Sequence, residues 1–272
     1  ITGIVLMPMG AAALVWSPLL KTLIGKVGLR GTFVSCGLFL FVAIILASRA
    51  MEIPHQENGL PQPAGAAEPV GRIDWRRLLC NPVFVLLWLM LGLTTGTGNM
   101  FAGQLVQVAA LNFKIPWGYL LVALFALAST LGRLIGGLLC DRFGYLRNIR
   151  VALLLLGGAM PLFLSGRGAP ALVAATLFLG AGYGSLFTSF PTATGNLFGL
   201  GDFGLIYGIL FTAVGIAGFA GPLAAALADR SGCYDGAFLI GLAAALLCFL
   251  LSVLLQRFTG ASPEPGDRAE GA

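Results

Sequence analysis

The side chain with the most distinctive chemistry in this sequence is the guanidinium of Arg133. It lies in the apolar stretch 119–139, eight residues before Asp141, which is about 12 Å along a helix at about 1.5 Å per residue. All eleven acidic residues fall in expected loops, helix ends or tails. A buried guanidinium without a carboxylate partner can hold a visiting anion through two parallel hydrogen bonds. Arg133 is therefore expected to bind an anionic substrate, unless it extends toward water or pairs with an acid outside this sequence.

A second set of candidates consists of neutral polar side chains within or beside apolar stretches. These residues are expected to line a binding cavity around the arginine, although each could instead bond to a neighbouring helix. They are Asn99, Gln104, Tyr183 and Tyr207.

The composition is that of a membrane protein. Hydrophobic residues make up 58% of the 272 residues and charged residues only 10%, whereas a soluble domain carries about 25% charged residues. The net charge of +5 is interpreted as loop charge that sets orientation, and no nucleic acid is expected as a partner. The five cysteines are scattered without metal-ligand spacing, so they are expected to be apolar fillers and no metal site is predicted.

Eight stretches are long and apolar enough to cross a bilayer as helices, since a span needs about 20 residues and backbone groups must be paired in lipid. They are 1–24, 32–48, 82–105, 119–139, 151–165, 170–190, 204–228 and 237–255. The fifth is short and is expected to extend back into Asn148 and Arg150. Glycine pairs four residues apart are expected to make packing contacts between helices: Gly92/Gly96, Gly132/Gly136, Gly180/Gly184 and Gly204/Gly208.

A polar linker separates the second and third stretches. Its first part is rich in Pro, Gly, Ala and Gln and should be flexible. At its end Asp74 could cap a short basic and apolar helix over 75–79, typical of a lipid headgroup layer. Asn81 and Pro82 then provide an N-cap and a first helical residue. Counting loop arginines and lysines favours a cytoplasmic linker.

The first two stretches resemble the last two at a constant offset of 204 residues. Pro18 corresponds to Pro222, Lys26 to Arg230 and Gly28 to Gly232. Two copies at this spacing predict a parallel repeat about an axis along the membrane normal. If the second copy is a six-helix unit, four helices of the first copy precede residue 1 and the complete molecule has twelve.

A loop between the fourth and fifth stretches carries acidic, basic and glycine residues in a fixed order. It is composed of Gly137, Leu138, Leu139, Cys140, Asp141, Arg142, Phe143, Gly144, Tyr145, Leu146 and Arg147. The acid can pair with adjacent bases or with a helix N-terminus, and the glycines permit a tight turn and close packing. The alternative is an ordinary basic turn.

This loop resembles the signature Gly-x-x-x-Asp-Arg-x-Gly of the major facilitator superfamily, although Leu146 stands at a position that is often basic. The segment from Phe203 to Pro222 and the turn from Gly232 to Phe238 are similar to the oxalate/formate antiporter and monocarboxylate transporter branch. The resemblance implies a major facilitator helical bundle. It implies the last two helices of an N-terminal bundle over 1–48, a cytoplasmic linker with an interfacial helix over 49–81, a C-terminal six-helix bundle over 82–256 and a disordered tail over 257–272. It also implies that Gly137, Asp141, Arg142, Gly144 and Arg147 stabilise one access state.

Two absences refine the expected substrate. Similar proton-coupled carriers place an acid one turn before such an arginine, where this chain has Ser129, and similar oxalate carriers add a second basic residue in the eleventh helix, which 205–228 lacks. A small monocarboxylate-like anion is therefore expected, carried by exchange with a counter-anion or by proton symport, in a multi-pass cell membrane, the inner membrane of a bacterium.

Three other functions stay open. The same fold could carry a drug or a sugar, or the chain could be a truncated membrane protein without transport activity. An enzyme is the least favoured, since the sequence has no nucleophile–base or metal constellation, no Gly-x-x-x-x-Gly-Lys-Ser/Thr loop for ATP and no sign of a cofactor.

Overall fold

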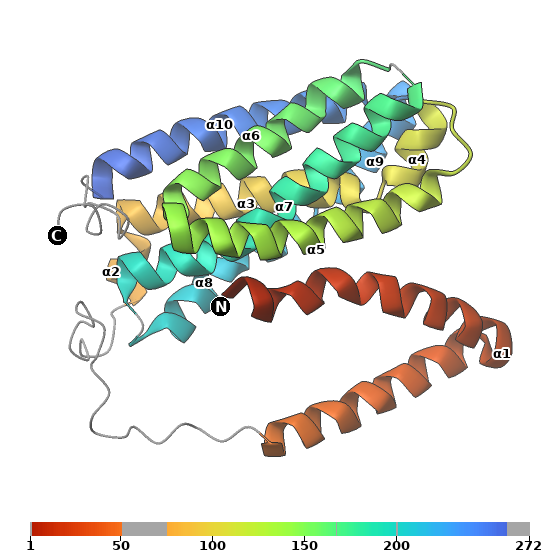
Figure 1. Ribbon diagram of the computed structural model, residues 1–272, viewed down its shortest axis with the longest axis horizontal. Helices are drawn as coiled ribbons and strands as arrows, with labels where there is room; N and C mark the ends of the chain where they lie inside the picture. The colour runs from red at the N-terminus through yellow and green to blue at the C-terminus, as the bar shows by residue number, and fades with distance from the viewer. Residues whose placement is uncertain (1, 51–74, 167, 200, 260–272) are drawn as a thin grey trace. The chain divides into compact units, whose positions relative to one another are not determined.

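The computed structural model describes residues 2–50, 75–166, 168–199 and 201–259 (Figure 1). Asp74, the flexible part of the linker and the tail from residue 260 on lie outside the described residues. The chain divides into two units. Residues 12–66 form one, and the helices that follow the linker lie in the other.

All regular structure in the described residues is α-helical. The helices are α1 (Thr2–Ala50), α2 (Trp75–Leu79), α3 (Pro82–Ala102), α4 (Leu105–Leu111), α5 (Gly118–Phe143), α6 (Tyr145–Leu164), α7 (Gly168–Phe198), α8 (Phe203–Ala217), α9 (Ala220–Ser231) and α10 (Asp235–Thr259). The expected short helix over 75–79 is present as α2. The fifth expected stretch does extend back past Asn148, since α6 begins at Tyr145.

Helix α1 consists of two arms joined at Gly28. This residue has φ 71° and ψ 175°, which are not helical angles, and glycine adopts a positive φ without the steric penalty of a Cβ. The two arms approach each other at Trp16 and Phe39, whose rings lie edge to face with centroids 6.2 Å apart. The two stretches expected over 1–24 and 32–48 are therefore one broken helix.

Two predicted helix boundaries are set by local chemistry. The Asn81 side chain accepts a hydrogen bond of 2.9 Å from the backbone N–H of Val83, and Pro82 follows as the first residue of α3, as the sequence predicts. The seventh expected stretch is broken into α8 and α9 near Gly218. Pro222 has no N–H to donate to the carbonyl of Gly218, so the regular i to i−4 ladder is interrupted there.

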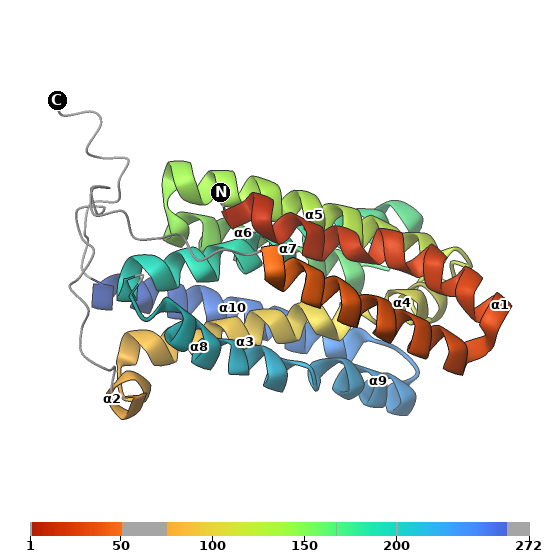
Figure 2. The ribbon, with the colours of Figure 1, turned by 90° about the horizontal axis from the view of Figure 1, so that it is seen from below.

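The helices after the linker form a bundle in which α7 packs between α5 and α6 (Figures 1 and 2). Helix α10 packs against α6 and α3, and α3 packs in turn against α8 and α9. Helix α2, the turn between α5 and α6, and the C-terminal end of α10 lie at one end of this bundle, and α4 lies at the other (Figure 1).

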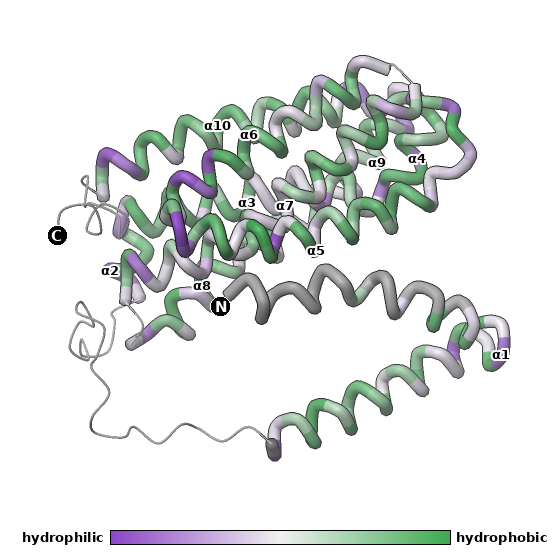
Figure 3. Tube along the Cα trace, viewed as in Figure 1, coloured by the Kyte–Doolittle hydropathy of each residue, from purple (hydrophilic) through white to green (hydrophobic). Residues whose placement is uncertain are grey.

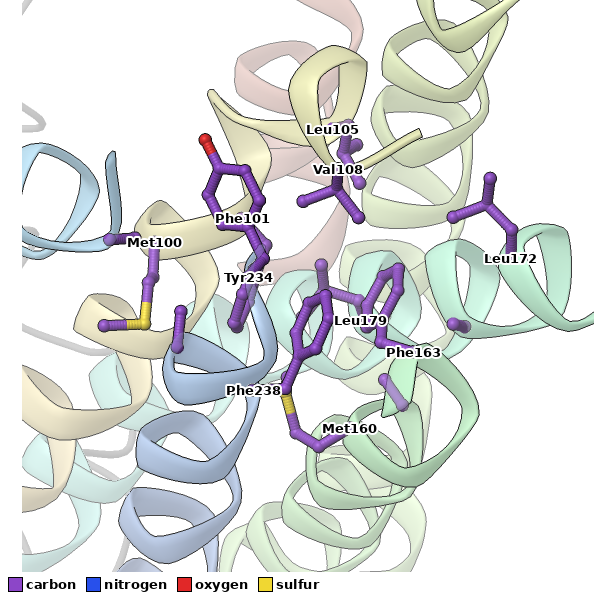
Figure 4. Packing of buried hydrophobic residues seen from close by; sticks show 14 of the residues in the cluster. Met100, Phe101, Leu105, Val108, Met160, Phe163, Leu172, Leu179, Tyr234 and Phe238 are labelled. Carbon is purple, nitrogen blue, oxygen red and sulfur yellow. The ribbon is translucent and has the colours of Figure 1, made fainter. Parts of the chain in front are cut away.

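Two hydrophobic clusters occupy the two ends of the bundle. The cluster near α4 contains the rings of Phe101, Phe163 and Phe238, whose centroids lie 5.1–5.8 Å apart (Figure 4). The other cluster contains Leu78 of α2 and the first half of α3. Between these clusters along α3 and α7 lie buried or half-buried polar residues: Thr94, Thr95, Thr97, Tyr183 and Ser185. The bundle therefore has a polar layer at its middle.

Seven helical segments in the described residues are long and apolar enough to cross a membrane: Thr22–Arg49, Pro82–Ala102, Gly118–Phe143, Tyr145–Leu164, Gly168–Phe198, Phe203–Ser231 and Asp235–Thr259. The expected first span over 1–24 is helical from Thr2 but is not among them as a separate span. Figure 3 shows the helices hydrophobic along their middle and hydrophilic mainly near their ends. This is the pattern of helices that cross an apolar layer.

Candidate functional site

Arg133 lies on α5 with only 4% of its surface exposed. Its Nη1 donates to the carbonyl oxygen of Ser129 at 3.1 Å and to the hydroxyl oxygen of the same serine at 2.5 Å. The buried Nε–H has no hydrogen-bond partner, and Nη2 makes no hydrogen bond to any described residue. No described carboxylate contacts the guanidinium. Because Nε–H and Nη2 point the same way from the planar group, one whole edge of the fork is left unbonded.

An aromatic and an amide group surround this arginine. The guanidinium carbon lies 5.3 Å from the ring centroid of Phe187, a distance at which the ring face attracts a cation. The ring of Tyr183 lies 5.0 Å from that of Phe187, and the Tyr183 hydroxyl donates to Oδ1 of Asn99 at 2.9 Å. Arg133, Tyr183 and Asn99, predicted separately from the sequence, therefore belong to one cluster that joins α5, α7 and α3.

Close packing between α5 and α7 holds this cluster in place. A Cβ at Gly184 would overlap the backbone carbonyl oxygen of Ser129, and one at Gly132 would overlap that of Ala181. At Gly180 a Cβ would lie 2.8 Å from the Cβ of Ala128. Small residues spaced four apart let two helix backbones approach this closely. The pairs Gly132/Gly136 and Gly180/Gly184 are packing contacts, as expected.

The other two glycine pairs behave differently. Gly92 and Gly96 meet only alanine side chains of α8 and α9, at 3.5–3.8 Å. For Gly204 and Gly208 a Cβ would meet no described atom within 4 Å. The expectation of a packing contact for this last pair is therefore not met within the described residues.

Gln104 lies in a different group, at the α4 end of the bundle. Its Oε1 accepts from the hydroxyl of Tyr234 at 3.2 Å. The backbone N–H of Tyr234 donates to Oδ1 of Asn112, and Nδ2 of Asn112 donates to Asp235 at 2.7 Å. Tyr234 lies outside the spans, where burial and the nearby charge of Asp229 raise the pKa of its phenol, so it stays a donor at neutral pH. These bonds tie the α9–α10 turn to the segment between α3 and α5.

Tyr207 also lies apart from Arg133. Its ring stacks on that of Phe203, with centroids 5.3 Å apart, and lies 5.6 Å from that of Phe211. All three belong to α8. The structure thus groups Arg133 with Tyr183 and Asn99, and places Gln104 and Tyr207 in other surroundings.

The loop between α5 and α6 turns at Gly144, which has φ 86° and donates its N–H to the carbonyl of Cys140 at 3.0 Å. Gly137 is buried, whereas Asp141, Arg142 and Arg147 are exposed. Leu146, at the position expected to be basic, is only 7% exposed and packs in the hydrophobic cluster near α2. Its apolar character follows from that burial, since a basic side chain there would be buried with the apolar residues of the cluster.

A buried polar network next to this loop is a feature that sequence reasoning missed. Nδ2 of Asn148 donates to the hydroxyls of Ser185 at 3.0 Å and Ser189 at 2.7 Å, and lies 3.3 Å from Sγ of Cys140. Asn148 is 2% exposed. The sequence signal is an amide at the start of α6 facing two serines four residues apart on α7. The network links α5, α6 and α7 where the loop leaves the bundle.

Replacing Asn148 with leucine is expected to lower stability by about 1–2 kcal/mol, because interhelical hydrogen bonds in membranes contribute about 0.6 kcal/mol on average and at most about 1.7. The measurement is the fraction of purified protein that stays monodisperse after heating. Ser165→Ala is the matched control, since that hydroxyl bonds only to Leu162 within its own helix. Equal heat resistance of the Asn148 variant and the parent would contradict a stabilising network.

The described residues contain no group of three or more His, Cys, Asp or Glu side chains that could hold a metal ion. The functional chemistry on view is that of one buried guanidinium with a free edge, aromatic rings beside it and an amide one tyrosine away. Such a site can bind an anion; it contains no nucleophile paired with a base.

Helices of this length and hydropathy define a multi-pass membrane protein. The family model of the Major Facilitator Superfamily matches residues 1–222 and residues 115–271, so the chain belongs to that superfamily. The probable transporter MCH1 of Saccharomyces cerevisiae is 30% identical over 151 residues, which make up 52% of this chain and 31% of the yeast protein. The match thus spans about a third of that relative's length.

Proposed function

We propose that this chain is part of a secondary carrier that moves a small organic anion, of the monocarboxylate kind, across the membrane by alternating access. The observation that carries the proposal is the unbonded Nε/Nη2 edge of Arg133, buried in the polar layer of the bundle. A carboxylate fits that edge with two charge-assisted hydrogen bonds. An uncompensated charge within a span is costly, and a bound anion would neutralise it.

Arg133 is the group that binds the carboxylate in this proposal, and its neighbours shape the rest of the site. Ser129 holds Nη1 from one side and so directs the free edge of the fork away from its own helix turn. Phe187 and Tyr183 offer apolar ring surface, which suits a small carbon skeleton. Asn99 and Tyr183 supply polar groups for a hydroxyl or keto oxygen on the substrate. One arginine matches one negative charge.

The arrangement of the halves is also a proposal. We assign α3 to α10 to a C-terminal six-helix bundle and the arms of α1 to the last two helices of an N-terminal bundle. Gly28 and Gly232, paired by the 204-residue offset, both have positive φ (71° and 76°) and each joins two helices. The same family model matches residues 115–222 twice, as expected for a protein built from two similar halves.

Orientation follows from charge. In the bundle after the linker, the end that carries α2 has the basic residues Arg76, Arg77, Arg142, Arg147, Arg150 and Arg257, whereas the described residues of the opposite end contribute Lys114 and Arg230. Basic residues accumulate on the cytoplasmic side. We therefore place the linker and the loop over 141–147 in the cytoplasm, where Gly137, Asp141, Arg142, Gly144 and Arg147 would stabilise one access state.

The experiment is an uptake panel in cells or vesicles that express the protein. Labelled monocarboxylates are expected to accumulate, unlabelled monocarboxylates to compete, and sugars and neutral drugs to do neither. Preloading with the anion separates exchange, which it would speed, from proton symport, which an acid outside would speed. Uptake of a sugar or a neutral drug without anion uptake would contradict the proposal, as would no transport of any solute by the full gene product.

A further inference from the structure

The surface beside α2 and the start of α3 has an unusual combination of groups. An apolar cavity of about 210 Å³ is lined by Leu79, Phe84, Val85 and Trp88. Arg76 and Arg77 precede it directly in the chain. Both arginines are exposed, as is Trp75 at 54%. This surface lies at the end of the bundle where the first membrane span begins after the linker (Figure 1).

Packing fixes which way α2 faces. Leu78 is 6% exposed and belongs to the same hydrophobic cluster as Phe84, so this side of the short helix is held against the bundle. Residues three and four apart on a helix are neighbours, so Arg76 and Trp75 lie one turn from Leu79, which lines the cavity. The guanidinium of Arg76 also lies 5.1 Å from the Trp75 ring centroid. Positive charge and apolar cavity are thus side by side.

We propose that this surface is a binding site for an anionic phospholipid. The cavity of Leu79, Phe84, Val85 and Trp88 holds part of one acyl chain, and the side chains of Arg76 and Arg77 bind the headgroup phosphate. Tryptophan and arginine are the residues that anchor proteins at the headgroup layer, and a pair of arginines binds phosphate through several hydrogen bonds. The complementarity is double, since the ligand needs one anionic end and one apolar end in that order.

The choice of a phospholipid over other ligands rests on position. The cavity lies on the flank of a membrane span rather than inside the bundle, next to residues expected at the headgroup level. Trp88 also donates from Nε1 to Thr212 of α8 at 3.0 Å, so a chain in the cavity would lie against the residue that links α3 to α8. The proposal is independent of what Arg133 binds.

The test uses the purified full chain in detergent and two lipid probes with brominated acyl chains, phosphatidylglycerol and phosphatidylcholine. Bromine quenches tryptophan fluorescence at contact. The anionic probe is expected to quench at roughly 20-fold lower concentration than the neutral probe, since each basic residue near an anionic lipid contributes about 1 kcal/mol, or about fivefold. Trp88→Phe is expected to remove most of this quenching.

The variant Arg76→Gln/Arg77→Gln is expected to abolish the preference for the anionic probe while leaving the neutral probe unchanged. Arg257→Gln is the matched control, because that arginine is exposed in the last turn of α10 at the same end, and it should keep the preference. An unchanged preference in the double variant, or quenching that does not depend on Trp88, would overturn the proposal. Competition by free glycerol phosphate as strong as by the lipid would also overturn it, because the site would then bind a soluble phosphate.

Discussion

Replacing Arg133 with glutamine is expected to abolish uptake of the organic anion and to leave the folded protein at least as stable as the parent. The first effect follows because the carboxylate loses two charge-assisted hydrogen bonds of about 1.5–3 kcal/mol each. Even the lower figure sums to about 3 kcal/mol, which is a loss of roughly 100-fold in affinity. The second effect follows because the variant removes a buried charge that has no ion-pair partner among the described residues.

The two readouts together separate binding from folding. A merely structural arginine would lose heat resistance along with uptake, whereas a binding arginine loses only uptake. Arg133→Lys is the informative companion, since it keeps the charge but presents no planar fork. It is expected to retain weak, low-affinity uptake. Full uptake in the glutamine variant, measured at equal protein levels in the membrane, would contradict the role assigned to Arg133.

Replacing Gly184 with alanine is expected to have the largest effect on folding of any single methyl group in the bundle. The added Cβ would overlap the backbone carbonyl oxygen of Ser129, and a backbone cannot move aside as a flexible side chain can. Overpacking of this kind costs about 1–3 kcal/mol, and the shift would also displace Arg133, whose Nη1 is bonded to the same carbonyl. Both the yield of monodisperse protein and anion uptake should fall.

The matched control is Gly208→Ala, which adds the same methyl group to the middle of α8. No described atom lies within 4 Å of a Cβ at that position, and alanine favours the helix over glycine by about 1 kcal/mol. This variant should therefore be as stable as the parent or more so. Equal heat resistance of the Gly184 and Gly208 variants would contradict the close α5–α7 crossing.

Features that depend on neighbours in the chain were predictable from the sequence. The N-cap at Asn81, the short helix α2 and the turn at Gly144 each rest on residues within a few positions of one another. Hydropathy likewise located the spans, because crossing an apolar layer requires a long run of apolar residues.

Features that depend on partners far along the chain were not predictable in the same way. Gln104 was expected in a cavity, but its partner is Tyr234, 130 residues away. The Asn148 network was missed because its serines lie 37 and 41 residues further on. Leu146 looked like a departure from a basic pattern until its burial was known. Glycine spacing indicated which helices could pack closely, but only the packing shows that Gly204/Gly208 has no described neighbour.

The joint position of Arg133, Tyr183 and Asn99 is an intermediate case. Each was singled out as a polar side chain in an apolar stretch, but the sequence gives no information on which of four such residues meet the arginine. The close α5–α7 crossing and the Tyr183–Asn99 hydrogen bond decide it. A candidate set was therefore predictable, and its geometry required the fold.

Equilibrium binding of a radiolabelled monocarboxylate to the purified protein tests the central claim most directly, because it needs neither coupling ion nor membrane gradient. The account predicts saturable binding that other monocarboxylates displace and that Arg133→Gln weakens about 100-fold, with Arg257→Gln unchanged. Binding of equal affinity to the parent and to Arg133→Gln would show that the free edge of this guanidinium does not hold the anion.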